Sequence, residues 1–257
     1  MARTEYGLQL WSLHDIAPTN LRGALEEVAK MGYKYVEFAG FFDNKAEDVK
    51  AWLDEYGLIA SGTHTNMCAL EDGAIDATIA FHQAIGCKSL IVPGADWSTE
   101  EKMNENIDLL NRAQKKLAAA GIRLGYHNHS REFFETSYGK IVENEVIART
   151  NVDLEIDTFW AFNAGKDPVA LLESLKDRIH VIHLKDGIPT APKNYNIDHC
   201  HDNVHGRSVG SGKAPVKAVR EWAIKNNVLM VIESEGLDPT GLEEVKRCIT
   251  FLRSLEA

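Results

Sequence analysis

The segment that decides the fold is a strand–helix–strand unit in the middle of the chain. It reads Gly-Cys-Lys-Ser-Leu-Ile-Val (86–92), then a long polar stretch with apolar residues such as Ile107 and Leu110, then Gly-Ile-Arg-Leu-Gly-Tyr-His (121–127). The apolar runs predict strands, and the apolar residues three apart between them predict an amphipathic helix. Two strands joined in this way lie parallel, with a right-handed crossover. The segment therefore predicts an α/β fold.

The same unit recurs along the chain, and a glycine stands shortly before several predicted strands, where a left-handed residue ends a helix. The predicted strands are residues 6–11, 33–38, 58–63, 89–92, 122–127, 152–157, 179–184 and 228–233. Eight such units in roughly 250 residues predict a (β/α)8 TIM barrel, with residues 1–257 forming a single domain. A doubly wound open sheet is the alternative, but no glycine-rich dinucleotide turn follows the first strand.

The charge balance restricts the partners. The chain has 257 residues, with 28 Lys and Arg against 38 Asp and Glu, and a formal net charge of −10. Such a charge disfavours a nucleic-acid partner and an anionic membrane surface. The four cysteines lack C-x-x-C spacing, the first residues lack the apolar run of a signal peptide, and no run of about 18 apolar residues occurs. We expect a cytoplasmic protein with reduced thiols, and a homo-oligomer is compatible with these features.

Imidazoles and carboxylates gather where the later predicted strands end. They are His127, His129, Asp157, His183 and Glu233. All strand ends meet on one face of a parallel barrel, so we expect these side chains to lie together. A buried carboxylate at the end of an apolar strand needs a partner, which a divalent cation supplies. One Asp, one Glu, one His and a fourth ligand from the fifth strand suit Mn²⁺, Mg²⁺ or Co²⁺ at least as well as Zn²⁺. The sequence therefore predicts an enzyme with one divalent metal ion.

The sixth predicted strand carries three alternating acids that point the same way, Asp153, Glu155 and Asp157. Three carboxylates inside one barrel would repel one another unless some bind a cation or protrude beyond the rim. We expect Asp157, the last of the three, at the metal. Asp153 and Glu155 are expected at the closed end of the barrel or in ion pairs.

Three motifs resemble those of the sugar phosphate isomerase/epimerase family with a xylose isomerase-like barrel, which is related to inosose dehydratases, hydroxypyruvate isomerases and endonuclease IV. The motifs are Leu-Gln-Leu-Trp-Ser-Leu (8–13), Gly-Tyr-His-Asn-His-Ser-Arg-Glu-Phe (125–133) and His-Leu-Lys-Asp-Gly (183–187). The resemblance spans nearly the whole chain. It implies that Asp157, His183 and Glu233 are metal ligands from the sixth, seventh and eighth strands.

The chain departs from this family at two positions. His127 stands where the family carries a ligand glutamate, so either His127 binds the metal or Glu132 reaches back to it. We favour Glu132, because a second carboxylate balances a divalent charge better. In addition, Trp160 stands where family epimerases often carry a substrate-binding histidine.

The chemistry common to the family is proton abstraction next to a carbonyl, through an enediolate that the metal stabilises. The resemblance implies that Glu233 is a base or acid, that His127 or His129 is the opposing group, and that Lys185 steadies an oxyanion. Weaker signals at other strand ends, and in the long segment after the seventh strand, suggest contacts with a small carbohydrate substrate. These residues are His64, Glu37, Trp11, Trp97, Asn128, Trp160 and Arg207. Packing or ion pairing is the alternative role for the histidine, the glutamate and the tryptophans among them.

A long segment after the seventh strand, residues 188–212, is predicted to be a lid or binding loop. Its cluster of His199, Cys200 and His201 lacks the spacing of a zinc finger. The leading functional hypothesis is a metal-dependent isomerase or epimerase of a sugar or keto-sugar. The alternative is a lyase or dehydratase acting on a keto-inositol or 3-keto-glycoside. A DNA-repair endonuclease is disfavoured by the acidic charge, and a non-catalytic sugar-binding protein would bind no metal.

Overall fold

The computed structural model describes residues 4–190 and 205–256. At its centre, eight parallel strands pair in the order β3-β2-β1-β10-β7-β6-β5-β4. A parallel bridge between His64 and Ile91 joins the two ends of this sheet, so the barrel is nearly closed. The strands are β1 (Gly7–Gln9), β2 (Tyr35–Phe38), β3 (Ile59–Thr63), β4 (Ser89–Val92), β5 (Arg123–His127), β6 (Asp153–Asp157), β7 (Val181–Leu184) and β10 (Leu229–Ile232). The predicted (β/α)8 barrel is confirmed.

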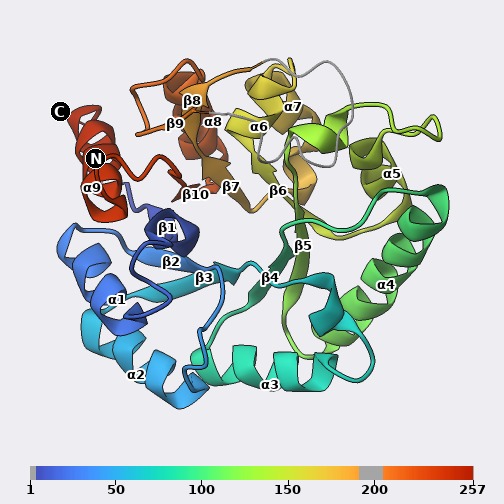
Figure 1. The fold of residues 1–257 in the computed structure, drawn as a ribbon, viewed down its shortest axis with the longest axis horizontal. Helices are drawn as coiled ribbons and strands as arrows, with labels where there is room; N and C mark the ends of the chain where they lie inside the picture. The colour runs from blue at the N-terminus through green and yellow to red at the C-terminus, as the bar shows by residue number, and fades with distance from the viewer. Residues whose placement is uncertain (1–3, 191–204, 257) are drawn as a thin grey trace.

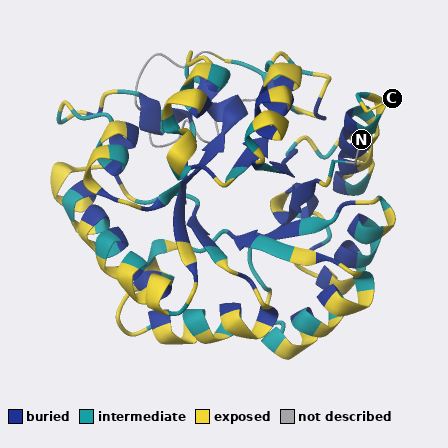
Figure 2. Cartoon of the chain, turned by 180° about the vertical axis from the view of Figure 1, so that it is seen from behind, coloured by how far each residue is buried: buried dark blue, intermediate teal, exposed yellow. Residues whose placement is uncertain are grey.

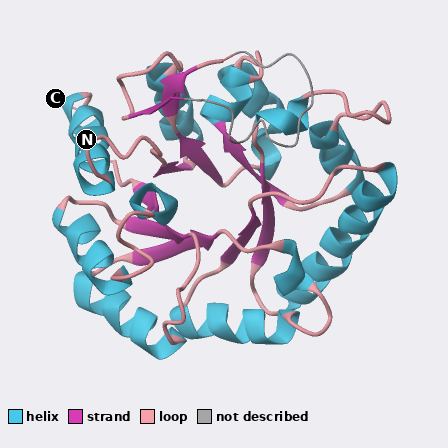
Figure 3. Ribbon diagram, in the orientation of Figure 1, coloured by secondary structure: helices cyan, strands magenta, loops and turns pink. Residues whose placement is uncertain are grey.

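Helices surround the strands (Figures 1 and 3). They are α1 (Leu21–Lys30), α2 (Ala46–Tyr56), α3 (Ile75–Ile85), α4 (Glu100–Ala119), α5 (Val142–Arg149), α6 (Thr158–Asn163), α7 (Pro168–Leu175), α8 (Val216–Asn226) and α9 (Gly241–Ser254). Figure 2 shows that the strands are mostly buried and that the outer helices are exposed on their outward sides. In α1 the buried stripe includes Leu21, Leu25 and Val28, as their spacing predicts. None of the described helices is both long and apolar enough to cross a membrane.

Glycines end several helices just before the next strand. Gly32, Gly57, Gly86 and Gly121 have φ angles of 90°, 66°, 75° and 76°. A side chain is disfavoured in this left-handed region, so glycine is the residue that stops the helix there. These stops fix where each following strand begins, and hence which side chains reach the carboxyl end of the barrel.

Two segments differ from the prediction. The first strand ends at Gln9 rather than at Trp11, because the Gln9 side chain accepts a hydrogen bond from the Trp11 backbone N–H at 2.9 Å and starts a 3₁₀ turn. The segment after β7 contains an antiparallel pair, β8 (Asp186–Ile188) and β9 (His205–Arg207). The rest of the predicted lid, with His199, Cys200 and His201, lies outside the described residues and stays a prediction.

Candidate active site

The carboxyl ends of β5, β6 and β7 and the residue after β10 bring four side chains together. His127, Asp157, His183 and Glu233 each place a nitrogen or oxygen within 4.8 Å of the others. All four are buried. Asp157 lies directly beside His183 in the parallel ladder of β6 and β7. Two imidazoles and two carboxylates in one buried cluster form a suitable donor set for a divalent metal ion.

Asp157 keeps one oxygen available for such an ion. Its Oδ1 accepts hydrogen bonds from the backbone N–H groups of Phe159 and Trp160, both at 2.9 Å, and so caps α6. Its Oδ2 is buried and has no hydrogen-bond partner among the described residues. Burial raises the pKa of Asp157 to about 7, against the opposing effect of Lys185. A buried carboxylate oxygen without a partner is costly, and a cation would remove that cost.

The Asn128 side chain holds the backbone N–H and the backbone carbonyl of Asp157. Its Oδ1 accepts from the Asp157 N–H at 3.0 Å, and its Nδ2 donates to the Asp157 carbonyl at 3.3 Å. Both ends of the amide thus hold the Asp157 backbone in place, and the predicted substrate contact of Asn128 stays a prediction.

Glu233 lies between a histidine and a lysine. Its Oε2 is 3.3 Å from His183 Nδ1 and accepts a hydrogen bond from Lys185 Nζ at 3.0 Å. Burial alone would raise the pKa of Glu233, but Lys185 and His183 lower it below its ordinary value. Lys185 is buried as well, and its Nζ also forms an ion pair with Glu235 at 2.8 Å and lies 4.7 Å from the centre of the Trp160 ring. Glu233 is therefore a charged carboxylate that is held in place.

Glu132, the favoured fourth ligand, does not join this cluster. Its Oε1 accepts from the Tyr126 hydroxyl and from Arg131 Nε, both at 3.1 Å, and its Oε2 accepts from the His129 backbone N–H at 2.9 Å. Both oxygens thus hold the turn after β5, a 3₁₀ turn from Ser130 to Phe133. His127, the alternative that the sequence left open, is the residue of β5 that lies in the cluster.

A second layer of side chains lies directly below, towards the barrel interior. His64, His127, Glu155 and His183 form another group with ligand atoms within 4.8 Å of one another. Glu37 joins it through His183 Nε2 at 2.7 Å and accepts a hydrogen bond from Gln9 at 2.7 Å. Glu155 thus lies at the centre of the barrel, and its ion pairs are with histidines.

The charges of this inner layer are mutually dependent. Burial and the neighbouring Glu37 raise the pKa of Glu155 to about 7. Burial alone would lower the pKa of His64, but Glu37 and Glu155 raise it to about 9. Burial would likewise raise the pKa of Glu37, but His64 and His183 lower it well below its ordinary value. Protons or cations must therefore balance the carboxylates at this depth.

Above the cluster lies a cavity of about 800 Å³, large enough for a small carbohydrate. Of the predicted site residues, its walls include Trp11, His64, His127, His129, Trp160 and Glu233. The pKa values of His127 and His129 are lowered well below the ordinary range, mainly by burial, so both rings are neutral near pH 7. The indole Nε1 of Trp160 is buried without a hydrogen-bond partner among the described residues. The two imidazoles line the cavity and can exchange hydrogen bonds with a ligand there.

Three other predicted substrate contacts lie away from this cavity. Trp97 is fully buried and donates from Nε1 to the Tyr126 hydroxyl at 2.8 Å, so it packs behind β5. Arg207 is exposed on β9. Glu37 lies in the inner layer, below the cavity. Thus not every aromatic or charged residue near a strand end lies at the mouth of the barrel.

Comparison with known proteins agrees with this architecture. Residues 25–255 match the family model described as "Xylose isomerase-like TIM barrel". The chain belongs to this family. It is 26% identical to an inosose dehydratase from Geobacillus kaustophilus over 63% of this chain and 60% of that protein. It is 27% identical to a 2-oxo-tetronate isomerase from Haemophilus influenzae over 60% of this chain and 69% of that protein.

A solved structure with the same fold is that of a sugar phosphate isomerase/epimerase from Parabacteroides distasonis. It superposes with a TM-score of 0.79 at 24% sequence identity, covering 98% of this chain and 94% of the other. The resemblance to the sugar isomerases and epimerases with a xylose isomerase-like barrel, inferred from the sequence, is thus confirmed. The relatives include both an isomerase and a dehydratase, so membership of the xylose isomerase-like family leaves the reaction to be argued from the site.

The central position of Glu155 in this xylose isomerase-like barrel was not predicted from the sequence. Its alternation with Asp157 predicts that the two carboxylates share a face, but not how deep Glu155 lies. The depth follows from barrel register, since Glu155 pairs with His127 across β5 and β6. The signal that could have found it is that an acid in the middle of an apolar strand needs partners, which here come from three other strands.

Proposed function

We propose that the protein is a divalent-metal-dependent isomerase or epimerase of a sugar or keto-sugar that works through an enediolate. The observation that carries the proposal is the convergence of His127, Asp157, His183 and Glu233, a cluster that borders the large cavity through His127 and Glu233. Because Asp157 Oδ2 is buried without a partner among the described residues, this donor set fits a cation. With His127 as a ligand the set has two nitrogens, which favours Mn²⁺, Co²⁺ or Zn²⁺ over Mg²⁺.

The cation would polarise carbonyl and hydroxyl oxygens of the substrate and so stabilise the enediolate. Glu233 is charged, held by Lys185 and open to the cavity, which suits it to remove a proton next to the carbonyl. Lys185 places a buried positive charge close to the same position and would stabilise a developing oxyanion.

His129 is the candidate for the opposing acid/base group. It lines the cavity, and its lowered pKa leaves it neutral and able to take up or pass on a proton. His127 is instead assigned to the metal, because its ring lies within both donor groups. Trp11 and Trp160 provide aromatic surfaces in the cavity wall, on which a sugar ring could stack.

A lyase or dehydratase is the second candidate, and the similarity to an inosose dehydratase favours it. The two reactions share proton abstraction next to a carbonyl. They differ in the next step, because elimination needs protonation of a leaving hydroxyl, whereas isomerisation needs reprotonation of carbon. His129 could serve either reaction.

Product analysis separates the two candidates. The Mn²⁺-loaded protein would be incubated with 2-oxo-tetronate, a keto-inositol and a 3-keto-glycoside, and the products followed by NMR, with Glu233→Gln as the inactive control. We expect an isomer or epimer with no loss of water. An unsaturated product would favour the lyase, and no conversion of any keto-sugar by the wild-type protein would contradict both.

A further inference from the structure

Carboxylates gather in the wall of the cavity and beneath it. Glu37, Glu155, Asp157, Glu233 and Glu235 carry five carboxylates, and the ammonium group of Lys185 pairs with the last two. When the histidines bind cations as neutral ligands and the carboxylates are deprotonated, the group has four more negative than positive charges. One divalent cation at the mouth would balance half of this excess, and the rest lies deeper, around Glu155.

We propose that the barrel interior holds a second divalent cation site, built on His64, His127, Glu155 and the inner nitrogen of His183 and suited to zinc or cobalt. The ligand atoms already converge. Glu155 Oε2 lies 2.8 Å from His64 Nε2, 3.2 Å from His127 Nδ1 and 3.3 Å from His183 Nε2. Zinc bonds of 2.0–2.1 Å in a tetrahedron place neighbouring ligand atoms about 3.3 Å apart, so small shifts would suffice.

Two oxygens support this inner site independently of the distances. Glu155 Oε1 and Glu37 Oε2 are both buried, and neither has a hydrogen-bond partner among the described residues. Burial of unpartnered carboxylate oxygens is costly. A cation held by three imidazoles and a carboxylate, with Glu37 beside it, would balance their charge.

His183 connects the two sites. Its Nδ1 faces the outer group, 3.3 Å from Glu233 and 3.9 Å from Asp157. Its Nε2 faces the inner group, 2.7 Å from Glu37 and 3.3 Å from Glu155. The His183 ring can therefore bind one cation through each nitrogen, and it loses its N–H protons when both cations bind. The inner ion would also fix the orientation of His127 and His183 beneath the reacting substrate.

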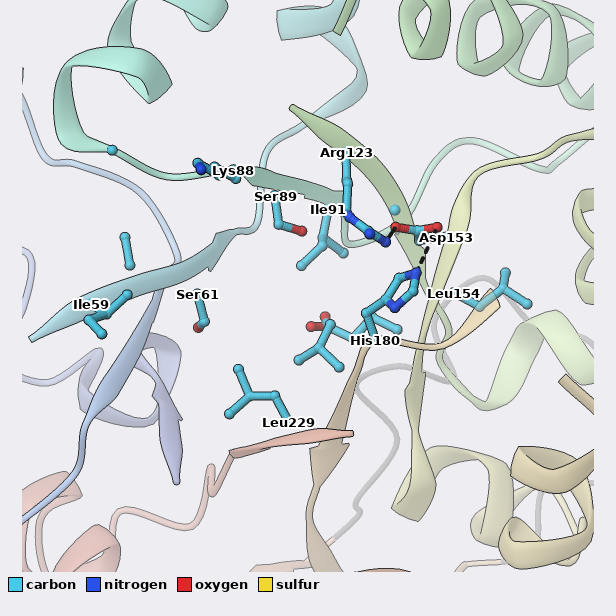
Figure 4. Close-up of a pocket in the computed structure, with 15 residues that line it drawn as sticks. Ile59, Ser61, Lys88, Ser89, Ile91, Arg123, Asp153, Leu154, His180 and Leu229 are labelled. Atoms are coloured by element: carbon cyan, nitrogen blue, oxygen red, sulfur yellow. Dashed lines mark hydrogen bonds and ion pairs between the residues drawn. The ribbon is translucent and has the colours of Figure 1, made fainter. Parts of the chain in front are cut away.

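A second cavity lies at the opposite end of the barrel and borders the inner group. Its volume is about 380 Å³, and Glu155 is part of its lining as well as of the inner group. Figure 4 shows this cavity, with Asp153 and His180 on one side and Ser61 and Ser89 on another. The inner group therefore borders both cavities, through Glu155 at this end and through His64 and His127 at the mouth.

Zinc stoichiometry tests the inner site. Chelator-stripped protein would be saturated with zinc, desalted and analysed by plasma mass spectrometry. We expect about two ions per chain in the wild-type protein, about one in Glu155→Gln and about one in Asp157→Asn. His64→Gln, expected to keep one ion, is the second variant if Glu155→Gln does not fold. Asp153→Asn, expected to keep two, is the matched control.

Cobalt spectra locate the ion that each variant keeps. The inner ion, held by three imidazoles and one carboxylate, should give intense tetrahedral bands that Asp157→Asn retains and Glu155→Gln loses. The inner site shares His127 and His183 with the outer site on which the proposed function rests, but each site can be disproved without the other. A single wild-type ion that Asp157→Asn removes and Glu155→Gln keeps would overturn the inner site and leave the outer site standing, with protons balancing the inner carboxylates. Two ions in Glu155→Gln would also overturn it.

Discussion

The two ends of the barrel are built from the same strands but have different chemistry, and β6 shows this most clearly. Asp153, at its start, is partly exposed and forms ion pairs with Arg123 at 3.2 Å and His180 at 3.7 Å. Asp157, at its end, is fully buried with one oxygen unpartnered among the described residues. The two carboxylates share a face and lie roughly 13 Å apart along the strand. Position along the strand, and not residue type, thus decides which acid lies in the buried cluster.

The cavities at the two ends differ in the same way. The amino-terminal cavity has aliphatic walls, with charged groups such as Lys88 and Arg123 among its lining. The carboxyl-terminal cavity is lined by imidazoles, indoles and carboxylates that belong to or adjoin a ligand cluster. The comparison predicts that substitutions at the mouth abolish activity, whereas equivalent substitutions at the opposite end leave it nearly unchanged.

The largest effect is expected for Glu233→Gln. Loss of the carboxylate removes both a metal ligand and the proposed base, so kcat/KM should fall by about 10³-fold or more. Steady-state kinetics on the substrate identified by NMR measures this. Glu235→Gln is the matched control, since its carboxylate also pairs with Lys185 but is partly exposed; its effect should be less than about tenfold. A Glu233→Gln protein with near wild-type kcat/KM would contradict the assignment.

A smaller effect, about 10²-fold on kcat, is expected for Lys185→Met. Lys185 and His183 lower the pKa of Glu233, so removal of the lysine should raise it. Below its pKa Glu233 is protonated and cannot act as a base. The acid limb of the profile of kcat/KM against pH should therefore move to higher pH. Lys166→Met, an exposed change, should leave the profile in place, and an unshifted acid limb in Lys185→Met would count against the proposed pairing.

Glu143 allows a stability test outside the reacting cluster. Burial, and then the charge of Glu132, raise its pKa to about 8. The folded protein therefore keeps this proton at pH values where the unfolded chain has lost it, so stability falls as the pH rises from about 4.5 to 8. Glu143→Gln should be more stable than wild type by about 2–4 kcal/mol at pH 8.5 and nearly equal to it at pH 4.5.

Urea unfolding at the two pH values measures this difference. Glu145→Gln on the same helix is the control, because Glu145 is partly exposed and forms ion pairs with Lys140 and Arg149. Its effect should stay within about 1 kcal/mol at both pH values. An equal gain for both variants, or none for Glu143→Gln at pH 8.5, would show that burial of this carboxyl group costs little.

The smallest effect is expected at the amino-terminal end. Asp153→Asn removes an ion pair between partly exposed groups, so stability should change by less than about 1 kcal/mol. The kcat/KM should stay within about twofold of wild type, as measured by steady-state kinetics. A large loss of activity would mean that the amino-terminal end takes part in the reaction.

The fold could be predicted from the sequence because local signals and topology agree. Apolar runs give the strands, positive-φ glycines such as Gly57 and Gly121 end the helices, and eight repeats close a parallel barrel. The places where prediction failed depend on side-chain contacts that no pattern encodes. Gln9 ends β1 early through its own side chain, and β8 pairs with β9 within a segment predicted as a loop.

The candidate site could be predicted only in part, because the sequence locates strand ends but does not encode side-chain contacts. Strand ends locate Asp157, His183 and Glu233, but the choice between His127 and Glu132 depends on where a turn directs each side chain. Glu132 is held by hydrogen bonds from three neighbours, which its sequence spacing does not indicate. The depth of Glu155 likewise follows from register between strands, which sequence periodicity leaves undefined.

The most direct test of the central claim is deuterium exchange from D₂O into the carbon next to the substrate carbonyl. It would be followed by NMR for wild type, Asp157→Asn and Asp153→Asn, each stripped of metal and then refilled with Mn²⁺. The account predicts no exchange in stripped protein, restored exchange in refilled wild type and Asp153→Asn, and none in Asp157→Asn. Exchange that persists without metal, or in refilled Asp157→Asn, would contradict a metal-dependent proton abstraction at the mouth of the barrel.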